Sequence, residues 1–301
     1  MISVGRILEG AFGVFREHFT AVTIWGGIYL AGNLALLLVM QPIMQGALAP
    51  GAQADPAQMM SAMGPVWLLG FLMGIVGVVL YTASMRSVLR PDAGGIAFLR
   101  LGLDELRMLG LLMLFIIGGS VLFGLASTVM ALFIGGIAAS IESAMFTGIM
   151  SVLVVLAVFV IVLFFVVRFS LAFPLTLHRG AFAIGEAWRL SRGHFWKLFA
   201  AALVVAVIGF VASIAINMIS AGSHFAEVLA AVSDPSDDGT RVRILEQRAA
   251  TLGSFNMMMI LQSIGGSAVA AIWIALSGGS AATAARLLVA DEFNDAEEVF
   301  G

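Results

Sequence analysis

VLVVLAVFVIVLFFVV, residues 152–167, is an unbroken run of sixteen apolar side chains that ends at Arg168. With its neighbours it fills the uncharged stretch between Glu142 and Arg168, which has room for the roughly 20 apolar residues that span a bilayer. Five more such stretches lie between Glu17 and Asp55, Asp55 and Arg86, Arg107 and Glu142, Lys197 and Glu227, and Arg248 and Arg286. The pattern predicts an all-α fold, a polytopic membrane helix bundle with six transmembrane helices.

The composition supports this class. The 301 residues are 61% hydrophobic and 11% charged, with a mean hydropathy of +1.06, whereas about 25% of the residues of a soluble domain are charged. The net charge of −3 gives no reason to expect nucleic acid as a partner. The chain has no cysteine, which excludes disulfides, thiol catalysis and cysteine-ligated metal centres.

We expect a single membrane domain over residues 1–290 and an acidic cytoplasmic tail over residues 291–301. The spans are placed at residues 19–40, 64–85, 108–136, 144–177, 198–222 and 255–288, with a water-facing outer loop over residues 223–254. The first span is too long, and too far from the small residues Ala52 and Ala54, to be a cleaved signal peptide.

The cationic side chains lie almost entirely on one side of these spans. Only Arg241, Arg243 and Arg248 fall on the side opposite the N-terminus. The other twelve are Arg6, Arg16, Arg86, Arg90, Arg100, Arg107, Arg168, Arg179, Arg189, Arg192, Lys197 and Arg286. By the positive-inside rule, both termini are expected in the cytoplasm.

Three cytoplasmic segments, residues 2–18, 95–107 and 181–196, mix apolar residues with arginines at helical spacing. We expect them to be amphipathic helices in the membrane interface. Their arginines are candidates for contact with lipid headgroups: Arg16, Arg100, Arg107, Arg189 and Arg192. Asp104 with Arg107, and Glu186 with Arg189, have the three-residue spacing of neighbours on one helix face. Two interpretations stay open, namely ordinary connectors and a dedicated lipid or partner site.

An internal repeat relates the first and third of these segments. Ala11, Phe12, Val14, Arg16, His18 and Phe19 match Ala187, Trp188, Leu190, Arg192, His194 and Phe195 at a constant offset. The middle segment matches loosely through residues 103–107. The repeating unit would be an interfacial helix followed by a two-span hairpin, present three times.

Few polar residues are expected at membrane depth, and they are Asn33, Arg168, Asn217 and Gln262. The three amides are expected to hydrogen-bond between spans. Arg168 allows two interpretations, a headgroup-level anchor or a guanidinium carried into the bundle by a helix kinked at Pro174. Gly70 and Gly74 form a GxxxG pattern, which predicts close helix packing and a homo- or hetero-oligomer contact.

No motif for catalysis or for a cofactor is apparent in the chain. Asp234, Ser236, Asp238 and Gly239 fit the first half of a calcium loop, but Leu245 stands where the loop needs a glutamate. Methionines near both ends of the outer loops are expected to be apolar fillers rather than copper ligands. We therefore predict no metal site, no cofactor and no enzymatic activity.

The stretch 168–205, RFSLAFPLTLHRGAFAIGEAWRLSRGHFWKLFAAALVV, carries a family resemblance. It resembles uncharacterised bacterial inner-membrane proteins related to the membrane domain of glycerophosphoryl diester phosphodiesterases. In that pattern an Arg and a Pro close one span, an interfacial helix follows and an aromatic opens the next, here Arg168, Pro174 and Phe195. The resemblance implies a bacterial inner-membrane location, and it carries over no catalytic residue, because no sequence like the catalytic domain is present up to Gly301.

Together these patterns favour a non-enzymatic integral inner-membrane protein that engages membrane lipids, in lipid or envelope homeostasis. The alternative is a small-solute permease in which Asn33, Arg168, Asn217 and Gln262 line a path. The absence of Asp, Glu and Lys at mid-membrane argues against ion-coupled transport.

Overall fold

The protein is an all-helical, multi-pass membrane protein. The computed structural model describes residues 2–48, 60–93, 95–140, 144–233 and 257–300, and these contain no strand. Six helices are long and apolar enough to cross a membrane, as predicted. They are carried by α2 (Phe19–Leu48), α4 (Gly64–Leu89), α5 (Leu103–Ser140), α6 (Ala144–Phe169), α9 (Phe195–Ser233) and α11 (Met257–Phe300). The short elements are α1 (Val4–Glu17), η1 (Pro91–Ala93), η2 (Ile96–Phe98), α7 (Ala172–Arg179) and α8 (Ile184–Ser191).

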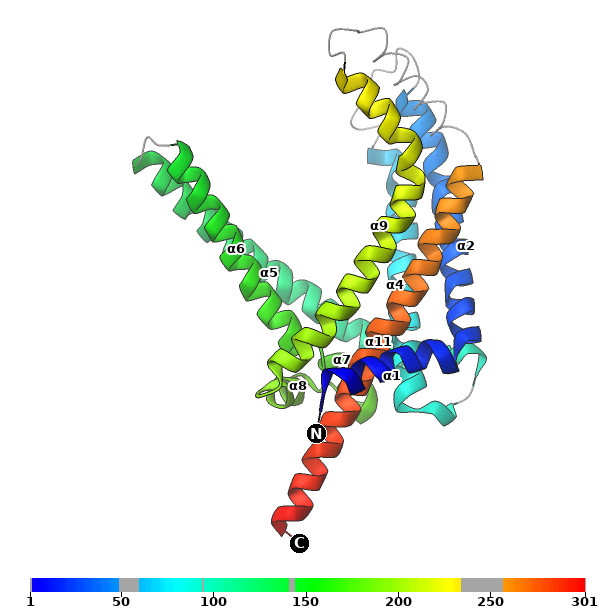
Figure 1. The fold of residues 1–301 in the computed structure, drawn as a ribbon, viewed down its shortest axis with the longest axis vertical. Coiled ribbons are helices and arrows are strands. Elements are labelled where there is room, and N and C mark those ends of the chain that lie inside the picture. The colour runs from blue at the N-terminus through cyan, green and yellow to red at the C-terminus, as the bar shows by residue number, and fades with distance from the viewer. Residues whose placement is uncertain (1, 49–59, 94, 141–143, 234–256, 301) are drawn as a thin grey trace.

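Helix α11 is the centre of the bundle, since it packs against α1, α2, α4, α7 and α9 (Figure 1). Its small residues allow this. A β-carbon added to Gly279 would lie 2.9 Å from Val14 Cγ2 and 3.1 Å from Ala11 Cα, and one added to Gly278 would lie 2.6 Å from Ser84 Oγ. Only glycine permits such close approach of helix backbones, and close approach is how helices gain packing energy in lipid.

The hairpin of α5 and α6 leans away from the other spans (Figure 1). It contacts them at its base, through α4, α7, α8 and α9. Further from the base its side chains are exposed on both helices, among them Ile117, Leu122, Phe133, Leu153 and Phe159. Lipid tails are as apolar as these side chains, so burying them inside the protein would gain no hydrophobic free energy.

Two of the three amphipathic segments contain a short helix, and one does not. Helix α1 lies within residues 2–18 and α8 within residues 181–196. The expectation of one helix over residues 95–107 is wrong, because η2 is a single 3-10 turn and residues 103–107 are the first turns of α5. Gly95 has a positive φ of 102°, and Gly102 precedes the first residue of α5. Glycine is a poor helix former at both places.

The fourth span, placed at residues 144–177, consists of two helices, and the first ends near Arg168. Helix α6 ends at Phe169, a turn follows at residues 170–171, and α7 begins at Ala172. Pro174 explains the break, because its ring clashes with the carbonyl four residues earlier, that of Ser170.

The helices also extend beyond the predicted spans. Helix α9 continues to Ser233, so the expected outer loop at residues 223–254 begins as helix, and residues 234–256 lie outside the described part of the chain. The expected acidic tail at residues 291–301 continues α11 as far as Phe300. Residues 291–300 contain neither proline nor glycine, so nothing in them ends the helix.

Candidate functional site

The five arginines predicted to meet lipid headgroups all lie at one end of the bundle. Arg16 is in the last turn of α1, Arg100 and Arg107 flank the start of α5, Arg189 is in α8 and Arg192 caps it. This is the lower end in Figure 1, where both ends of the chain also lie. All are exposed except Arg107, which is half-buried.

Three of these five arginines have partners within the protein. Arg107 Nη1 donates to Asp104 Oδ1 at 3.2 Å, as the spacing predicted, and Arg189 Nη2 donates to Glu292 Oε1 at 2.8 Å. Arg100 Nη2 donates to the Ala93 carbonyl at 2.5 Å. Arg16 and Arg192 form no ion pair within the described residues and are the two fully available cations of the set.

Glu186 and Arg189 lie three residues apart on α8, as expected, but they do not form an ion pair with each other. Glu186 instead accepts hydrogen bonds from Arg179, at 2.6 Å from Nη2 and 3.2 Å from Nε. Gly180, in the left-handed conformation with φ 66°, ends α7 and turns the chain back toward α8. This turn brings Arg179 within reach of Glu186, and it leaves Arg189 to the carboxylate on α11.

A charged cluster at the base of α4 and α5 was not among the predicted site residues. Arg86 and Glu105 form a buried ion pair, and Arg90 Nη1 donates to Asp104 Oδ2 at 2.9 Å. The sequence contains a signal for these ion pairs, since two arginines four residues apart end one span and two acids begin the next helix. That the Arg86–Glu105 pair is buried could be seen only in the tertiary structure. Its role is to join α4 to the base of the α5–α6 hairpin.

The loop that contains Ala97 and Phe98, next to this cluster, has a strained backbone. Ala97 and Phe98 have φ values of 55° and 58°, in the left-handed region that non-glycine residues avoid. Buried side chains from two spans hold both carbonyls: Trp25 Nε1 donates to Ala97 at 3.1 Å and Arg86 Nη1 donates to Phe98 at 2.7 Å. His18 packs edge-on against the Phe98 ring, with centroids 4.8 Å apart. Strained conformations persist only where such surroundings fix them.

Arg168 lies between its two predicted positions, because it neither enters the bundle core nor reaches freely away from the protein. It is in the last turn of α6 and half-buried against α8. Its guanidinium carbon lies 4.7 Å from the centre of the Trp188 ring and 5.4 Å from that of Phe164. Nη1 is 3.4 Å from the Trp188 carbonyl and 3.3 Å from Ser191 Oγ. Nε is buried without a hydrogen-bond partner in the described structure.

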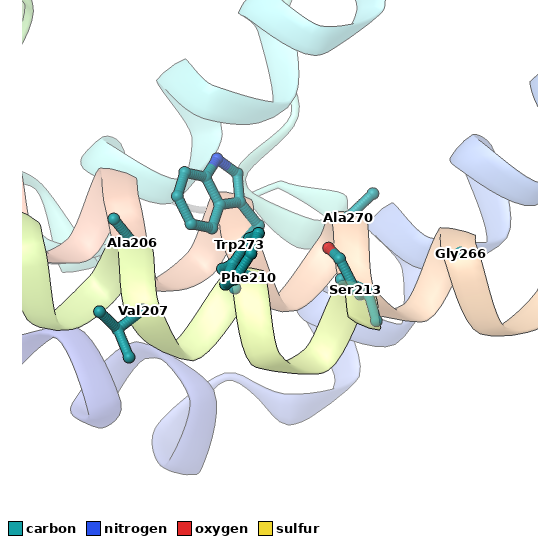
Figure 2. Close-up of a pocket in the computed structure, with 9 residues that line it drawn as sticks. Ala206, Val207, Phe210, Ser213, Gly266, Ala270 and Trp273 are labelled. Atoms are coloured by element: carbon teal, nitrogen blue, oxygen red, sulfur yellow. The ribbon is translucent and has the colours of Figure 1, made fainter. Parts of the chain in front are cut away.

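An apolar groove of about 740 Å³ lies between α9 and α11 (Figure 2). Phe210 and Ser213 of α9 and Ala270 and Trp273 of α11 are among its walls. Gly209 makes the crossing possible, because a β-carbon there would overlap the Trp273 ring. Sequence reasoning missed this groove, which depends on two helices far apart in the chain.

Within the described part of the chain, no hydrogen bond joins the three intramembrane amides to one another. Asn33 Nδ2 of α2 donates to Ser267 Oγ of α11 at 2.9 Å, which confirms an inter-span bond for this residue. Asn217 Nδ2 donates to the Ser213 carbonyl within α9, and Gln262 is exposed on α11. None of these amides lines the groove.

Gly70 and Gly74 face open space on α4, where an added β-carbon would meet no atom within 4 Å. They therefore make no close helix contact inside the described chain. Their use in an oligomer stays a prediction.

No cluster of metal-binding side chains is present among the described residues, and the calcium-like residues 234–239 lie outside them. No protein-family model, no curated protein and no solved structure matches this chain. The cationic end and the groove are therefore the features of this chain that bear on its function.

Proposed function

We propose that this chain is a non-enzymatic integral protein of the bacterial cytoplasmic membrane that binds anionic lipid of the cytoplasmic leaflet. It would serve membrane-lipid or envelope homeostasis, with both termini in the cytoplasm. One observation carries the proposal: the arginines of α1, α8 and the start of α5 lie at one end of the bundle, beside both chain ends (Figure 1). The resemblance of residues 168–205 to bacterial inner-membrane proteins supports the location.

The amphipathic helices fit an interfacial position. In α1, Ile7, Ala11 and Val14 are buried against the bundle, while Arg16 is exposed in the last turn. In α8, Ala187 is buried while Arg189 and Arg192 are exposed at its end. Each exposed basic group near anionic lipid contributes about 1 kcal/mol of attraction. Several acting together would enrich anionic lipid around the protein.

The groove favours a lipid role over a permease. Its walls are apolar, and the amides Asn33, Asn217 and Gln262 lie elsewhere. Such walls suit an acyl chain better than a hydrophilic solute, which would need hydrogen-bonding groups along its path.

The test removes the cationic side chains without touching the spans. We expect Arg16→Gln, Arg189→Gln and Arg192→Gln together to reduce the anionic phospholipid that co-purifies with the folded protein, measured by native mass spectrometry. Added salt should produce the same loss, since it screens exposed charges over about 10 Å at 0.1 M. Arg241, Arg243 and Arg248 changed to Gln form the matched control, since they remove three charges that the sequence predicts on the opposite side. Unchanged lipid in the folded first variant would refute the proposal.

The orientation is tested separately. The chain contains no cysteine, so single cysteines placed at Ser236 and Asp295 can be labelled selectively. A membrane-impermeant thiol reagent should label Ser236→Cys from outside intact spheroplasts, and Asp295→Cys only after permeabilisation. Labelling of both from the same side would contradict the six-span topology.

A further inference from the structure

A second pocket, of about 290 Å³, lies between the end of α7 and α8, at the cationic end of the bundle. Arg179, Gly185, Glu186 and Arg189 line it. Three of these four residues are charged, whereas the walls of the α9–α11 groove are apolar. The volume is near the lower limit for small-molecule pockets, so the pocket suits one small polar group rather than a whole lipid.

Both arginines of this pocket keep unused donors. Arg179 donates to Glu186 through Nε and Nη2, and Arg189 donates to Glu292 through Nη2. Arg179 Nη1, Arg189 Nη1 and Arg189 Nε make no hydrogen bond within the described residues. A guanidinium has five N–H donors, and its planar fork matches the oxygens of a phosphate. A phosphate in the pocket can therefore accept from both arginines while each keeps its carboxylate partner.

The pocket also offers an acceptor of the opposite charge. Glu186 is half-buried, and Arg179 binds mainly its Oε1, at 2.6 Å from Nη2. Oε2 accepts only from Arg179 Nε, at 3.2 Å, in the part of the chain that the structure describes. Each carboxylate oxygen has about two lone-pair sites, so Oε2 can accept a further hydrogen bond from a cationic donor.

The charges around the pocket cancel. Arg179 and Arg189 are balanced by Glu186 and Glu292. A ligand with negative charge alone would be repelled by Glu186, and one with positive charge alone would be repelled by the arginines. Charge complementarity therefore favours a zwitterion, with a phosphate for the two arginines and a cation for Glu186.

The cation of this ligand should be a primary ammonium. Quaternary ammonium groups are recognised by aromatic cages, and none of the four residues that line the pocket is aromatic. A primary ammonium has N–H donors for Glu186, which a quaternary one lacks. A phosphate joined to a primary ammonium by two carbons is a phosphoethanolamine group.

The surroundings suit the headgroup layer of a membrane. Phe182, three residues before Gly185, is exposed, and so is Trp196, at the start of α9. Apolar aromatic side chains at the ends of spans and on interfacial helices lie at the level of the headgroups. A phosphoethanolamine group is present at that level when the bilayer contains phosphatidylethanolamine.

We propose that this pocket binds a phosphoethanolamine group, with the phosphate on the free donors of Arg179 and Arg189 and the ammonium on Glu186. The group reaches the pocket as the headgroup of phosphatidylethanolamine or as free phosphoethanolamine. The inference goes beyond the proposed function, because it adds a site for a zwitterion to a surface that attracts anionic lipid. It rests on the proposed function only for the assignment of the adjoining leaflet as cytoplasmic.

The experiment compares two zwitterionic lipids. The purified protein is delipidated with detergent, offered phosphatidylethanolamine or phosphatidylcholine of the same chain length, and examined by native mass spectrometry. The wild type should retain phosphatidylethanolamine about tenfold more tightly, because the three methyl groups of choline replace the N–H donors to Glu186. Equal retention of the two lipids overturns the inference.

Charge variants test the assigned roles. Arg179→Gln and Glu186→Gln should each weaken retention of phosphatidylethanolamine about tenfold, because each removes a charge-assisted hydrogen bond. Glu186→Gln should not weaken retention of phosphatidylglycerol, which has no ammonium. Glu9→Gln on α1 and Lys197→Gln on α9 are the matched controls, since both residues are exposed and neither lines the pocket. Unchanged retention of phosphatidylethanolamine in folded Arg179→Gln or Glu186→Gln contradicts the proposal.

A glycine variant tests the pocket without changing its charge. Gly185 has no atom within 4 Å of an added β-carbon, so Gly185→Leu should fill the pocket without a clash and weaken retention. Gly5→Leu is the control, because Gly5 is likewise the second residue of an amphipathic helix and likewise open. If a charge variant fails to fold, the comparison of these two leucine variants decides.

Free phosphoethanolamine identifies the source of the ligand. If it displaces the bound lipid, the headgroup alone is recognised. If the lipid binds and the free compound does not displace it, the ligand is the phospholipid. Both results support the site when the variants behave as expected, and binding of neither the lipid nor the free compound overturns it.

The outcomes separate this inference from the proposed function, because neither Arg179 nor Glu186 belongs to the triple arginine variant. Loss of anionic lipid in the triple variant, with phosphatidylethanolamine retained in Arg179→Gln and Glu186→Gln, supports the proposed function and overturns the pocket. Loss of phosphatidylethanolamine in these two variants, with no effect of the triple variant on anionic lipid, supports the pocket and refutes the proposed function.

Discussion

Arg86 of α4 and Glu105 of α5 form an ion pair in which both side chains are almost completely buried. Arg86 also donates to the Phe98 carbonyl, and Glu105 Oε2 accepts from the Gly102 backbone N–H at 3.0 Å, at the start of α5. The pair therefore fixes three things together: the end of α4, the strained loop and the first turn of α5. The leaning hairpin has its main polar attachment to the bundle here.

Breaking this pair from one side should be costly. We expect Arg86→Met or Glu105→Met to lower the free energy of unfolding by about 3 to 5 kcal/mol, because each leaves a buried charge without its partner. The double variant should recover much of that loss, and the remaining deficit should reflect the Phe98 carbonyl without its donor. Unfolding in detergent micelles measures all three. Additive losses in the double variant would show that the pair is not energetically coupled.

Trp25 should stabilise the strained loop through its indole N–H. Trp25→Phe keeps most of the buried ring but removes the hydrogen bond to Ala97, so we expect a loss of about 1 to 3 kcal/mol in the free energy of unfolding. Trp67→Phe is the matched control, since Trp67 is exposed on α4. Equal effects of the two changes would mean that the indole bond contributes nothing to stability.

The close approach of α11 to α1 predicts a position-specific effect of a single methyl group. Gly279→Ala should lower the free energy of unfolding by about 1 to 3 kcal/mol, because the new methyl group would press on the α1 backbone at Ala11. Gly266→Ala, on the same helix but facing open space, should change it by less than about 0.5 kcal/mol. Thermal unfolding of the two purified variants compares their stabilities. If Gly279→Ala is as stable as the wild type, α1 does not approach α11 this closely.

Gly70 and Gly74 of α4 face open space, so replacing them should affect only the association of one copy of the protein with another. Gly70→Leu with Gly74→Leu should leave the stability of the monomer unchanged, since no atom lies near either position. If the GxxxG pattern joins two copies, the same change should reduce the dimer fraction seen by light scattering in detergent. Gly118→Leu, open on α5 and outside the pattern, controls for added bulk. A dimer that persists in the double variant uses another surface.

Local patterns predicted much of the fold. Charge-free stretches long enough to span a bilayer predicted the six apolar helices, and Pro174 marked the region where α6 and α7 separate. The segment at residues 95–107 was the failure. Its arginines and apolar residues have helical spacing, but the hydrogen bonds of Trp25 and Arg86 hold the chain at Ala97 and Phe98 in a conformation that no helix contains.

Less of the candidate site could be predicted from the sequence. The arginines could be assigned to one side of the membrane, but their partners could not, as Glu186 shows by pairing with Arg179 rather than Arg189. Asn33 found its inter-span partner in Ser267, 234 residues away. Such partners follow from helix crossings, which spacing along one helix cannot reveal.

The sequence by itself determined that the chain is helical, that it crosses a membrane and that its cations gather on one side, because hydropathy and charge act locally along each segment. Only the tertiary structure decided that the α5–α6 hairpin leans outward, that Arg86 and Glu105 are buried together and that the Arg168 guanidinium lies over the Trp188 and Phe164 rings. In lipid, apolar surface gives little direction to helix association. The arrangement therefore depends on close contacts at small residues, such as Gly209 against Trp273, and on polar pairs between helices far apart in the chain.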